Sequence, residues 1–299
     1  MRLITRADLD GLTCALLLSQ VETIDDVMLA HPKDVQDGKV DIGPNDILAN
    51  LPRDPRAGMV FDHHASQSEE WKEGSSDKGA FSAHAPSAAR VVASHYATKD
   101  FSAYGELLHQ TDRLDSADLE PDDVTDPKGW ILVGYTLDPR TGMARYRDYF
   151  KHVLALVTAN PNDPDAVLAD PQVAERVSIL RDQQWEFMEH LISTSRTDGN
   201  VIISDVRGIK DLPLGNRFFI YTLFPDANVS VRLADGAGNA FTSIQVGHSI
   251  FNRTCKTSVG ALMAHFGGGG HFGAGTCQPA VDDADRVLGE IVTILKKNG

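Results

Sequence analysis

Two short acidic segments carry side chains of the kinds that bind metal ions. The sequence Asp-His-His at 62–64 directly follows an apolar run at 58–61 that is typical of a buried strand. Asp8 and Asp10 lie two residues apart, between a strand-like and a helix-like segment. Imidazole and carboxylate ligands together suit divalent ions such as Mn²⁺ or Zn²⁺. We interpret both segments as parts of a metal centre. The alternatives are a polar turn after the strand and a helix cap at Asp10.

Two further segments have chemistry of their own. Asp112 lies in an acidic cluster at 110–118, for which a solvated helix end is the alternative. Four consecutive glycines at 267–270 precede His271. Glycine is costly to order, but it lets backbone N–H groups approach an anion closely. The glycine run therefore indicates a phosphate-binding loop, and a flexible linker is the alternative.

The composition excludes several classes of protein. The 299 residues predict about two domains, and 42% hydrophobic with 23% charged residues is ordinary for a globular chain. A net charge of −14 disfavours binding to long duplex DNA. No apolar run approaches the ~20 residues of a membrane helix, and the first residues do not resemble a secretory signal. We expect a cytoplasmic protein without membrane contact, in which three scattered cysteines are buried and unpaired.

Strand-like and helix-like segments alternate in the first part of the chain. This alternation predicts an α/β fold with a mostly parallel sheet and helices on both faces. Ligands of such sheets bind beyond the carboxyl ends of the strands, where both acidic segments would then lie. The expected strands are 1–5, 25–30, 46–51 and 58–61, and the expected helices are 11–21, 87–96 and 101–111.

The rest of the chain predicts a helical segment and then a second, smaller α/β domain. We place an N-terminal domain at 1–193, a linker at 194–200 and a C-terminal domain at 201–299. The linker rests on its Ser, Thr, Asp and Gly content. A loop is expected at 118–127, helices at 130–137, 144–159, 163–169, 171–193, 214–224, 258–266 and 284–296, and strands at 201–205, 229–233 and 241–246.

Taken in order, these motifs resemble those of the DHH/DHHA1 phosphoesterases. That family includes RecJ-type exonucleases, nanoRNA-degrading oligoribonucleases, cyclic-dinucleotide phosphodiesterases, family II pyrophosphatases and exopolyphosphatases. The segment 246–254 before the glycine run is most similar to the exopolyphosphatase-related or nanoRNase-like subgroup. The resemblance covers nearly the whole chain. It rests on Asp8-x-Asp10, Asp62-His63-His64, Asp112 and Gly268-Gly269-Gly270-His271-x-x-Ala274-Gly275.

The resemblance implies hydrolysis of a phosphoester or phosphoanhydride in a cleft between a DHH domain and a DHHA1 domain. It implies one or two Mn²⁺ ions, with Mg²⁺ or Co²⁺ as alternatives. The positions that match metal ligands are Asp8, Asp10, His63 and Asp112, with Asn50 as a further candidate. Asp62, His63 and His64 match the catalytic motif, and Arg253, Gly268, Gly269, Gly270 and His271 match the part that holds the substrate phosphate.

The chain differs from the family pattern at two places. Residues 3–7 contain no histidine before the first aspartate, and Asn50 stands where an aspartate is usual. Arg6 could supply the positive charge of a metal ion there. The first hypothesis is therefore a metal-dependent hydrolase of a short oligonucleotide, a cyclic dinucleotide or polyphosphate. The alternative is a non-catalytic protein that binds nucleotide or phosphate through a degraded metal site. A homodimer is a further expectation.

Overall fold

The computed structural model describes residues 1–64, 78–137, 147–210, 212–213 and 215–297. The chain forms two compact units, one of residues 1–118 with 126–181 and one of residues 119–125 with 182–299. The boundary lies inside helix α9, Pro171–Thr194, rather than after it. A linker was expected at 194–200, but most of this segment is strand β6, Ser195–Asp198. Gly199 and Asn200 form a two-residue turn, so β6 pairs with the following strand, Val201–Asp205, as a hairpin.

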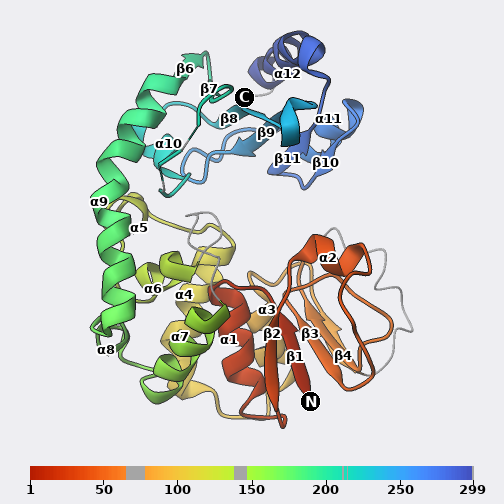
Figure 1. Cartoon of the computed structure of the whole chain (residues 1–299), viewed down its shortest axis with the longest axis vertical. Helices are drawn as coiled ribbons and strands as arrows, with labels where there is room; N and C mark the ends of the chain where they lie inside the picture. The colour runs from red at the N-terminus through yellow and green to blue at the C-terminus, as the bar shows by residue number, and fades with distance from the viewer. Residues whose placement is uncertain (65–77, 138–146, 211, 214, 298–299) are drawn as a thin grey trace. The chain divides into compact units, whose positions relative to one another are not determined.

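A parallel sheet of five strands organises the N-terminal unit, as the sequence predicts. The strand order is β2-β1-β3-β4-β5, and every pair is parallel. All carboxyl ends therefore lie at one edge of the sheet (Figure 1). Strand β4 ends at this edge with Asp62. The strands are β1 (Arg2–Thr5), β2 (Asp26–Leu29), β3 (Asp46–Ala49), β4 (Met59–Asp62) and β5 (Gly79–Phe81), the last of which was not expected.

Helices cover both faces of this sheet because its strands are apolar on both sides. Ile4, Leu48 and Val60 share one core with Val35 of α2 (Pro32–Gln36). On the other face, α1 (Leu9–Leu18) packs against β1, and α3 (Ala88–His95) packs against β4 and β5. The remaining helices of this unit are α4 (Gly105–Asp115), α6 (Gly129–Leu137), α7 (Arg147–Ala159), α8 (Pro164–Leu168) and the first part of α9.

Two expected boundaries differ from the structure in ways that matter for the site. The helix expected at 101–111 is α4, which runs on to Asp115, so its acidic residues belong to a helix and not to a following loop. The loop expected at 118–127 contains a short helix, α5 (Pro121–Thr125). Parts of the helices expected at 144–159 and 214–224 lie outside the described residues.

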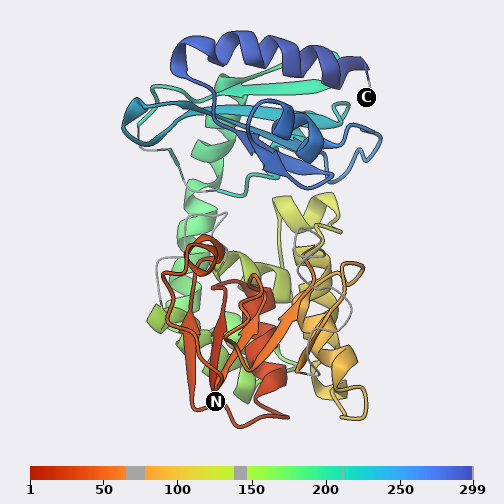
Figure 2. The ribbon, with the colours of Figure 1, turned by 90° about the vertical axis from the view of Figure 1, so that its right-hand side faces the viewer.

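The C-terminal unit has a mixed sheet of order β10-β11-β9-β8-β7-β6 (Figure 2). Its core joins alternate residues of the central strands, such as Val229 and Val231, to Val259 and Ile291 of two helices. Only β7 and β8 are parallel among the described pairs. The elements are β7 (Val201–Asp205), α10 (Phe219–Leu223), β8 (Val229–Asp235), β9 (Thr242–His248), α11 (Val259–His265), β10 (Gly269–Gly270), β11 (Ala274–Cys277) and α12 (Ala284–Lys297).

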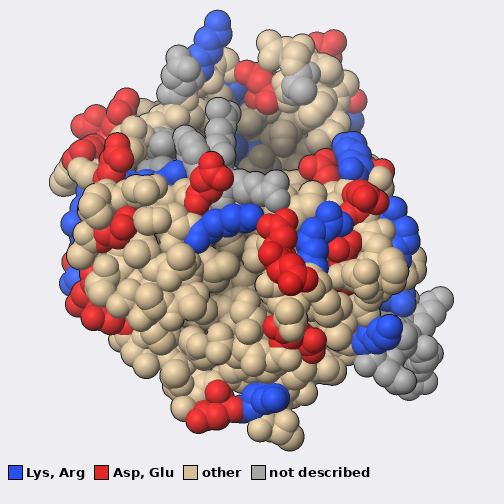
Figure 3. All heavy atoms as spheres, turned by 60° about the horizontal axis from the view of Figure 1, so that its bottom comes forward, with Lys and Arg blue, Asp and Glu red and all other residues tan. Residues whose placement is uncertain are grey.

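The surface and the cysteines agree with the composition. On the face drawn in Figure 3, acidic side chains lie in small groups beside basic ones, and the described residues form no continuous basic surface there. The three cysteines are buried and unpaired, as expected. Within the described residues, none of the helices has the length and apolar character to cross a membrane.

Candidate metal centre and phosphate-binding loop

The turn from β1 to α1 positions Asp8 and Asp10. The helix begins at Leu9, so its cap is Asp8, whose Oδ1 accepts a hydrogen bond from the N–H of Gly11 at 2.9 Å. The sequence-based alternative of a cap at Asp10 is therefore wrong, because the helix starts two residues earlier than expected. Gly11 is required for the tight turn, since a Cβ there would lie 2.1 Å from the carbonyl oxygen of Arg6.

Asp10 is a buried carboxylate held by the start of another helix. Its oxygens accept hydrogen bonds from the N–H groups of Ala88 and Ala89 at 2.9 and 2.8 Å, at the N-terminus of α3. Burial raises the pKa of Asp10 and the charge of Asp115 adds to this, whereas His63 lowers it, which leaves the pKa at about 7. A cation next to this carboxylate would therefore relieve an unfavourable buried charge.

His63 follows the end of β4, and its ring is oriented by a backbone carbonyl. Nδ1 lies 3.1 Å from the carbonyl oxygen of Ala85. When Nδ1 carries the proton and donates to this carbonyl, the lone pair of Nε2 faces the carboxylates of Asp10 and Asp115. This is how histidine ligands of metal ions are usually fixed.

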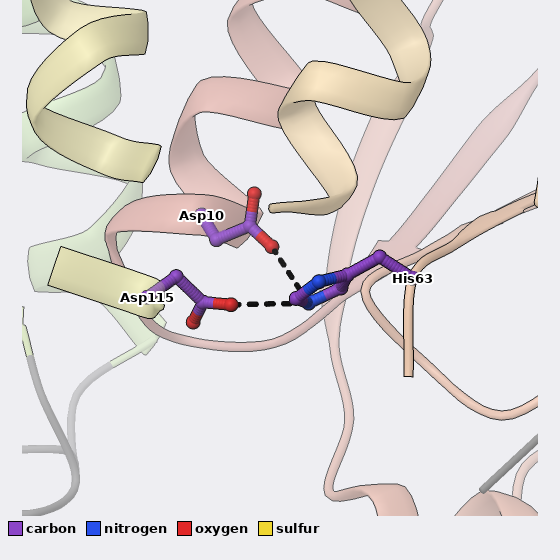
Figure 4. Close-up of side chains that lie close together, drawn as sticks. All are labelled: Asp10, His63 and Asp115. Carbon is purple, nitrogen blue, oxygen red and sulfur yellow. Dashed lines mark ion pairs between the residues drawn. The ribbon is translucent and has the colours of Figure 1, made fainter. Parts of the chain in front are cut away.

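Asp10, His63 and Asp115 bring one ligand atom each to a common point (Figure 4). These three atoms all lie within 4.8 Å of one another. Nε2 of His63 is 3.0 Å from Oδ2 of Asp115 and 3.9 Å from Oδ2 of Asp10, but it is buried and has no well-aligned hydrogen bond among the described residues. A nitrogen that faces two carboxylates in this way fits a cation between them.

The same three groups set the protonation state of the histidine. Burial lowers the pKa of His63, but the contact with Asp115 and the charge of Asp10 outweigh it and raise the pKa to about 9. Without a metal ion, the imidazole therefore carries a proton at neutral pH. A divalent ion would replace that proton.

Asp62 and His64 form a pair next to this triad in sequence. Nδ1 of His64 lies 2.7 Å from Oδ1 of Asp62, so the carboxylate fixes the imidazole ring. Asp62 is fully buried, and its Oδ2 has no hydrogen-bond partner among the described residues. Orphaned buried acceptors of this kind are typical of sites that bind a ligand or an ion.

Asp112 lies on the same helix as Asp115, but its carboxylate has other partners. Oδ1 accepts a hydrogen bond from the hydroxyl of Ser87 at 2.6 Å, and Oδ2 accepts one from Nε of Arg90 at 2.8 Å. Of the two acids, the structure places Asp115 in the triad. The assignment of Asp112 as a ligand rested on the resemblance and stays a prediction, which the geometry does not favour.

Asn50, Arg6 and Asp8 form a second group. Nδ2 of Asn50 donates to Oδ1 of Asp8 at 3.0 Å, and Nε of Arg6 lies 3.1 Å from Oδ2 of Asp8. Asn50 directly follows β3, is fully buried and has a φ of 57°, a backbone conformation that asparagine tolerates well. Asp46 lies at the other end of β3, where it pairs with Arg2 at 2.7 Å. It therefore does not belong to the edge of the sheet that carries Asn50.

Sequence reasoning did not single out Asp115. The signal was the spacing of three residues between Asp112 and Asp115, which places both on one face of a helix. Because the helix was expected to end at 111, the sequence did not predict that Asp112 and Asp115 lie on a helix, and their spacing did not show which way their side chains point. Asp112 also forms a salt bridge with Arg90 of α3.

The glycine run belongs to the C-terminal unit and forms a narrow hairpin, β10 with β11. Its N–H and carbonyl groups pair Gly269 with Thr276 and Gly270 with Gly275. A Cβ on Gly268 would lie 2.0 Å from the carbonyl oxygen of Thr276, and one on Gly270 would lie 2.2 Å from that of Ala274. These glycines are therefore required by the hairpin itself, which the flexible-linker reading does not explain.

Residues around this hairpin are rigidly connected to helix α11. The N–H of Gly260 donates to the carbonyl of His271 at 2.7 Å, and the N–H of Val259 donates to that of Phe272 at 2.8 Å. The side chain of His271 is exposed. Arg253 is exposed as well, and its Nε donates to the carbonyl of Ile250 at 2.9 Å. Both predicted phosphate contacts thus lie at the surface of this unit.

The hairpin leads to a prediction about two neighbouring glycines. Gly268→Ala should destabilise the protein by about 1–3 kcal/mol, because the new methyl group collides with backbone that cannot move freely. Gly269→Ala is the matched control, since a Cβ there meets no atom within 4 Å. Urea denaturation of both variants measures the difference. Equal free energies of unfolding would contradict the close packing of the hairpin.

Comparison with known proteins places this geometry in context. No family model and no curated protein matches the sequence. Among solved structures, the pGpG-specific phosphodiesterase PggH from Vibrio cholerae is 38% identical, with 100% of this chain and 99% of that chain covered and a TM-score of 0.81.

Two more distant structures share the fold. An exopolyphosphatase-related protein from Bacteroides fragilis is 12% identical, with 99% of this chain and 92% of that chain covered and a TM-score of 0.52. RecJ from Thermus thermophilus in complex with Mn²⁺ is 11% identical, with 99% of this chain and 52% of that chain covered and a TM-score of 0.52.

Proposed function

Because this chain belongs to the DHH family of phosphoesterases, we propose that it hydrolyses a short phosphodiester with a divalent cation bound by Asp10, His63 and Asp115. The observation that carries the proposal is the convergence of these three side chains within 4.8 Å. Two carboxylates and one imidazole suit Mn²⁺, and Mg²⁺ or Co²⁺ are the alternatives. The RecJ structure that shares this fold contains Mn²⁺.

The residues around the cation would each have a defined part. A bound divalent ion would lower the pKa of a water molecule and offset the negative charge that develops on the phosphate. Ala88 and Ala89 hold Asp10 in place through their N–H groups. Asp62 fixes the ring of His64, whose side chain is 30% exposed and can therefore donate a proton or a hydrogen bond to the substrate.

We assign the chemistry to the N-terminal unit and the binding of a substrate phosphate to the C-terminal unit. In the C-terminal unit, Arg253 and His271 are exposed, and Gly269 leaves open space where other residues would have a side chain. Guanidinium and imidazole groups donate hydrogen bonds to phosphate oxygens, and a glycine lets a ligand approach the backbone closely. Gly268 and Gly270 would support this loop through the hairpin rather than through direct contact.

The substrate that we propose is a short linear dinucleotide. PggH, which is 38% identical over its full length, is described as specific for pGpG. The net charge of −14 also favours a short substrate, because binding of long nucleic acid needs many phosphate contacts by basic side chains. A cytoplasmic location and a homodimer stay predictions from the sequence.

A substrate panel tests this proposal. Metal-stripped protein is incubated with pGpG, cyclic di-GMP or polyphosphate, with and without Mn²⁺, and the products are separated by chromatography. We expect conversion of pGpG to mononucleotide only with Mn²⁺, and slower or no conversion of the other two. Tight nucleotide binding without turnover in any condition would instead support the alternative of a non-catalytic nucleotide-binding protein.

The pair of Asp62 and His64 gives a separate prediction. Asp62→Asn should lower kcat by about 10- to 100-fold, since the amide cannot hold the His64 ring as the carboxylate does. Circular dichroism should show that the variant is folded, because the amide keeps the shape of the buried carboxylate. His152→Gln, which alters a histidine paired with Asp170 elsewhere in this unit, is the control and should retain full activity.

A further inference from the structure

Two acids near the triad are already neutralised by arginine side chains. Oδ2 of Asp8 lies 3.1 Å from Nε of Arg6, while its Oδ1 accepts hydrogen bonds from Gly11 and Asn50 at 2.9 and 3.0 Å. Asp8 is only 6% exposed, so these partners surround it. Both of its oxygens are thus engaged by groups of the protein itself.

Asp112, which the resemblance also implies as a metal ligand, is paired with an arginine in the same way. Arg90 contacts Oδ2 through Nε at 2.8 Å and also through Nη2, and Ser87 donates to Oδ1 at 2.6 Å. Arginine is always charged in proteins, so each of these two pairs has no net charge. A divalent ion bound to either acid would be repelled by the guanidinium beside it.

The remaining ligands suffice for one ion but not for two. A pair of ions about 3.5–4 Å apart acts on one phosphate and needs enough carboxylates to hold both charges. Asp10, His63 and Asp115 supply one set of ligands, and among the described residues Asp62 does not converge with further His, Cys, Asp or Glu side chains into a second set. Asn50, which faces Asp8, is neutral, and a neutral amide binds a divalent ion more weakly than a carboxylate does. The two-ion site that the resemblance allows therefore does not fit the residues around Asp8.

We propose that this centre binds a single divalent ion, at Asp10, His63 and Asp115, and that the Arg6 guanidinium supplies the second positive charge to the substrate phosphate. This inference rests on the proposed phosphodiesterase function. The Arg6 side chain is 29% exposed, so it is not sealed inside the protein. Its five N–H donors form a rigid fork, which can contact Asp8 and phosphate oxygens together. Asp8 then acts as a positioning residue for Arg6 and not as a metal ligand.

The number of bound ions is the first test. Metal-stripped protein is titrated with Mn²⁺ in a calorimeter, and the loaded protein is examined by electron paramagnetic resonance after gel filtration. We expect one ion per chain and the signal of isolated Mn²⁺. Two ions with a spin-coupled signal would overturn the single-ion inference but leave the hydrolase function intact. No bound ion would contradict both.

The role of Arg6 is tested by substitution. Arg6→Gln should lower kcat/KM for pGpG by at least 100-fold while one Mn²⁺ ion still binds. Arg6→Lys should recover part of this loss, because it restores the charge without the fork. Arg2→Gln is the matched control, since Arg2 is the first residue of β1, at the end of the strand opposite to Arg6, and pairs with Asp46 at 2.7 Å. It should keep kcat/KM within twofold.

Two results would overturn the role of Arg6. One is an Arg6→Gln variant with unchanged kcat/KM, which would mean that the guanidinium does not contact the phosphate. The other is an Arg6→Gln variant that binds two Mn²⁺ ions and retains full activity, which would mean that Arg6 only displaces an ion. Calorimetric titration of the variant with GMP measures phosphate binding. A cooperative thermal transition shows that the variant is folded, so the two measurements together distinguish loss of binding from unfolding.

Discussion

Asp115→Asn should remove the bound ion and lower kcat by about 10³-fold or more. Loss of one ligand releases the ion, and the activation of water and the neutralisation of phosphate charge by the ion are lost with it. The triad has two carboxylates, and replacing one leaves a neutral amide that binds the cation more weakly and does not balance its charge. Calorimetric titration with Mn²⁺ and the pGpG assay measure the two effects. The substitution preserves shape at a side chain that is 18% exposed, so the protein should remain folded.

Asp112→Asn is the informative comparison, because both acids lie in the last turn of α4. This variant should retain the ion. It should be destabilised by about 1–3 kcal/mol, since Arg90 loses a charged partner. If Asp112→Asn loses the ion and Asp115→Asn keeps it, the assignment from the structure is wrong and the assignment from the family resemblance is right.

The contrast between Asp112 and Asp115 shows which features of the site could be predicted from the sequence and which could not. The parallel sheet and the position of 62–64 at a strand end followed from apolar runs alternating with helical segments, and the structure confirms both. Which acid faces the histidine depends on where α4 ends, and helix ends are the least reliable part of a sequence-based prediction. An error of four residues at that end hid Asp115.

Contacts between segments that are distant in the sequence could not be predicted from the sequence either. Arg90 and Asp112 are 22 residues apart, and Asn50 and Asp8 are 42 residues apart. Neither pair has a local sequence signal, because each depends on how the sheet and helices bring loops together. The absent histidine and Asn50 were visible as departures from the family pattern. The structure adds that Arg6 and Asn50 contact the two oxygens of Asp8, while Oδ1 of Asn50 is buried and has no hydrogen-bond partner among the described residues.

The glycine run illustrates a different limit. Consecutive glycines indicate close approach of backbone, and the sequence left open what approaches. In the structure, Gly268 and Gly270 are needed for contact with the opposite strand, whereas Gly269 has open space around it. A motif that looks uniform in the sequence thus combines two positions that require glycine with one that has open space beside it.

The affinity for Mn²⁺ should rise steeply with pH, by roughly 1000-fold between pH 6 and pH 8. His63 must lose its proton to bind the ion, and its pKa is raised to about 9. Below that value, each unit of pH should therefore change the affinity about tenfold. Asp10, with a pKa of about 7, adds a second competing proton below neutral pH, so the dependence should be steeper from pH 6 to 7 than from pH 7 to 8.

Calorimetric titrations at pH 6, 7 and 8 measure this dependence directly. Repeating the titration at pH 7 in buffers with different enthalpies of ionisation counts the protons released, and between one and two per ion are expected, one from His63 and about half a proton from Asp10. His152→Gln should show the same dependence, because its pair with Asp170 does not involve the triad. An affinity that stays constant between pH 6 and pH 8 would mean that His63 is not a ligand. The ion would then have to bind through carboxylates alone, and the triad would lose its role as the metal centre.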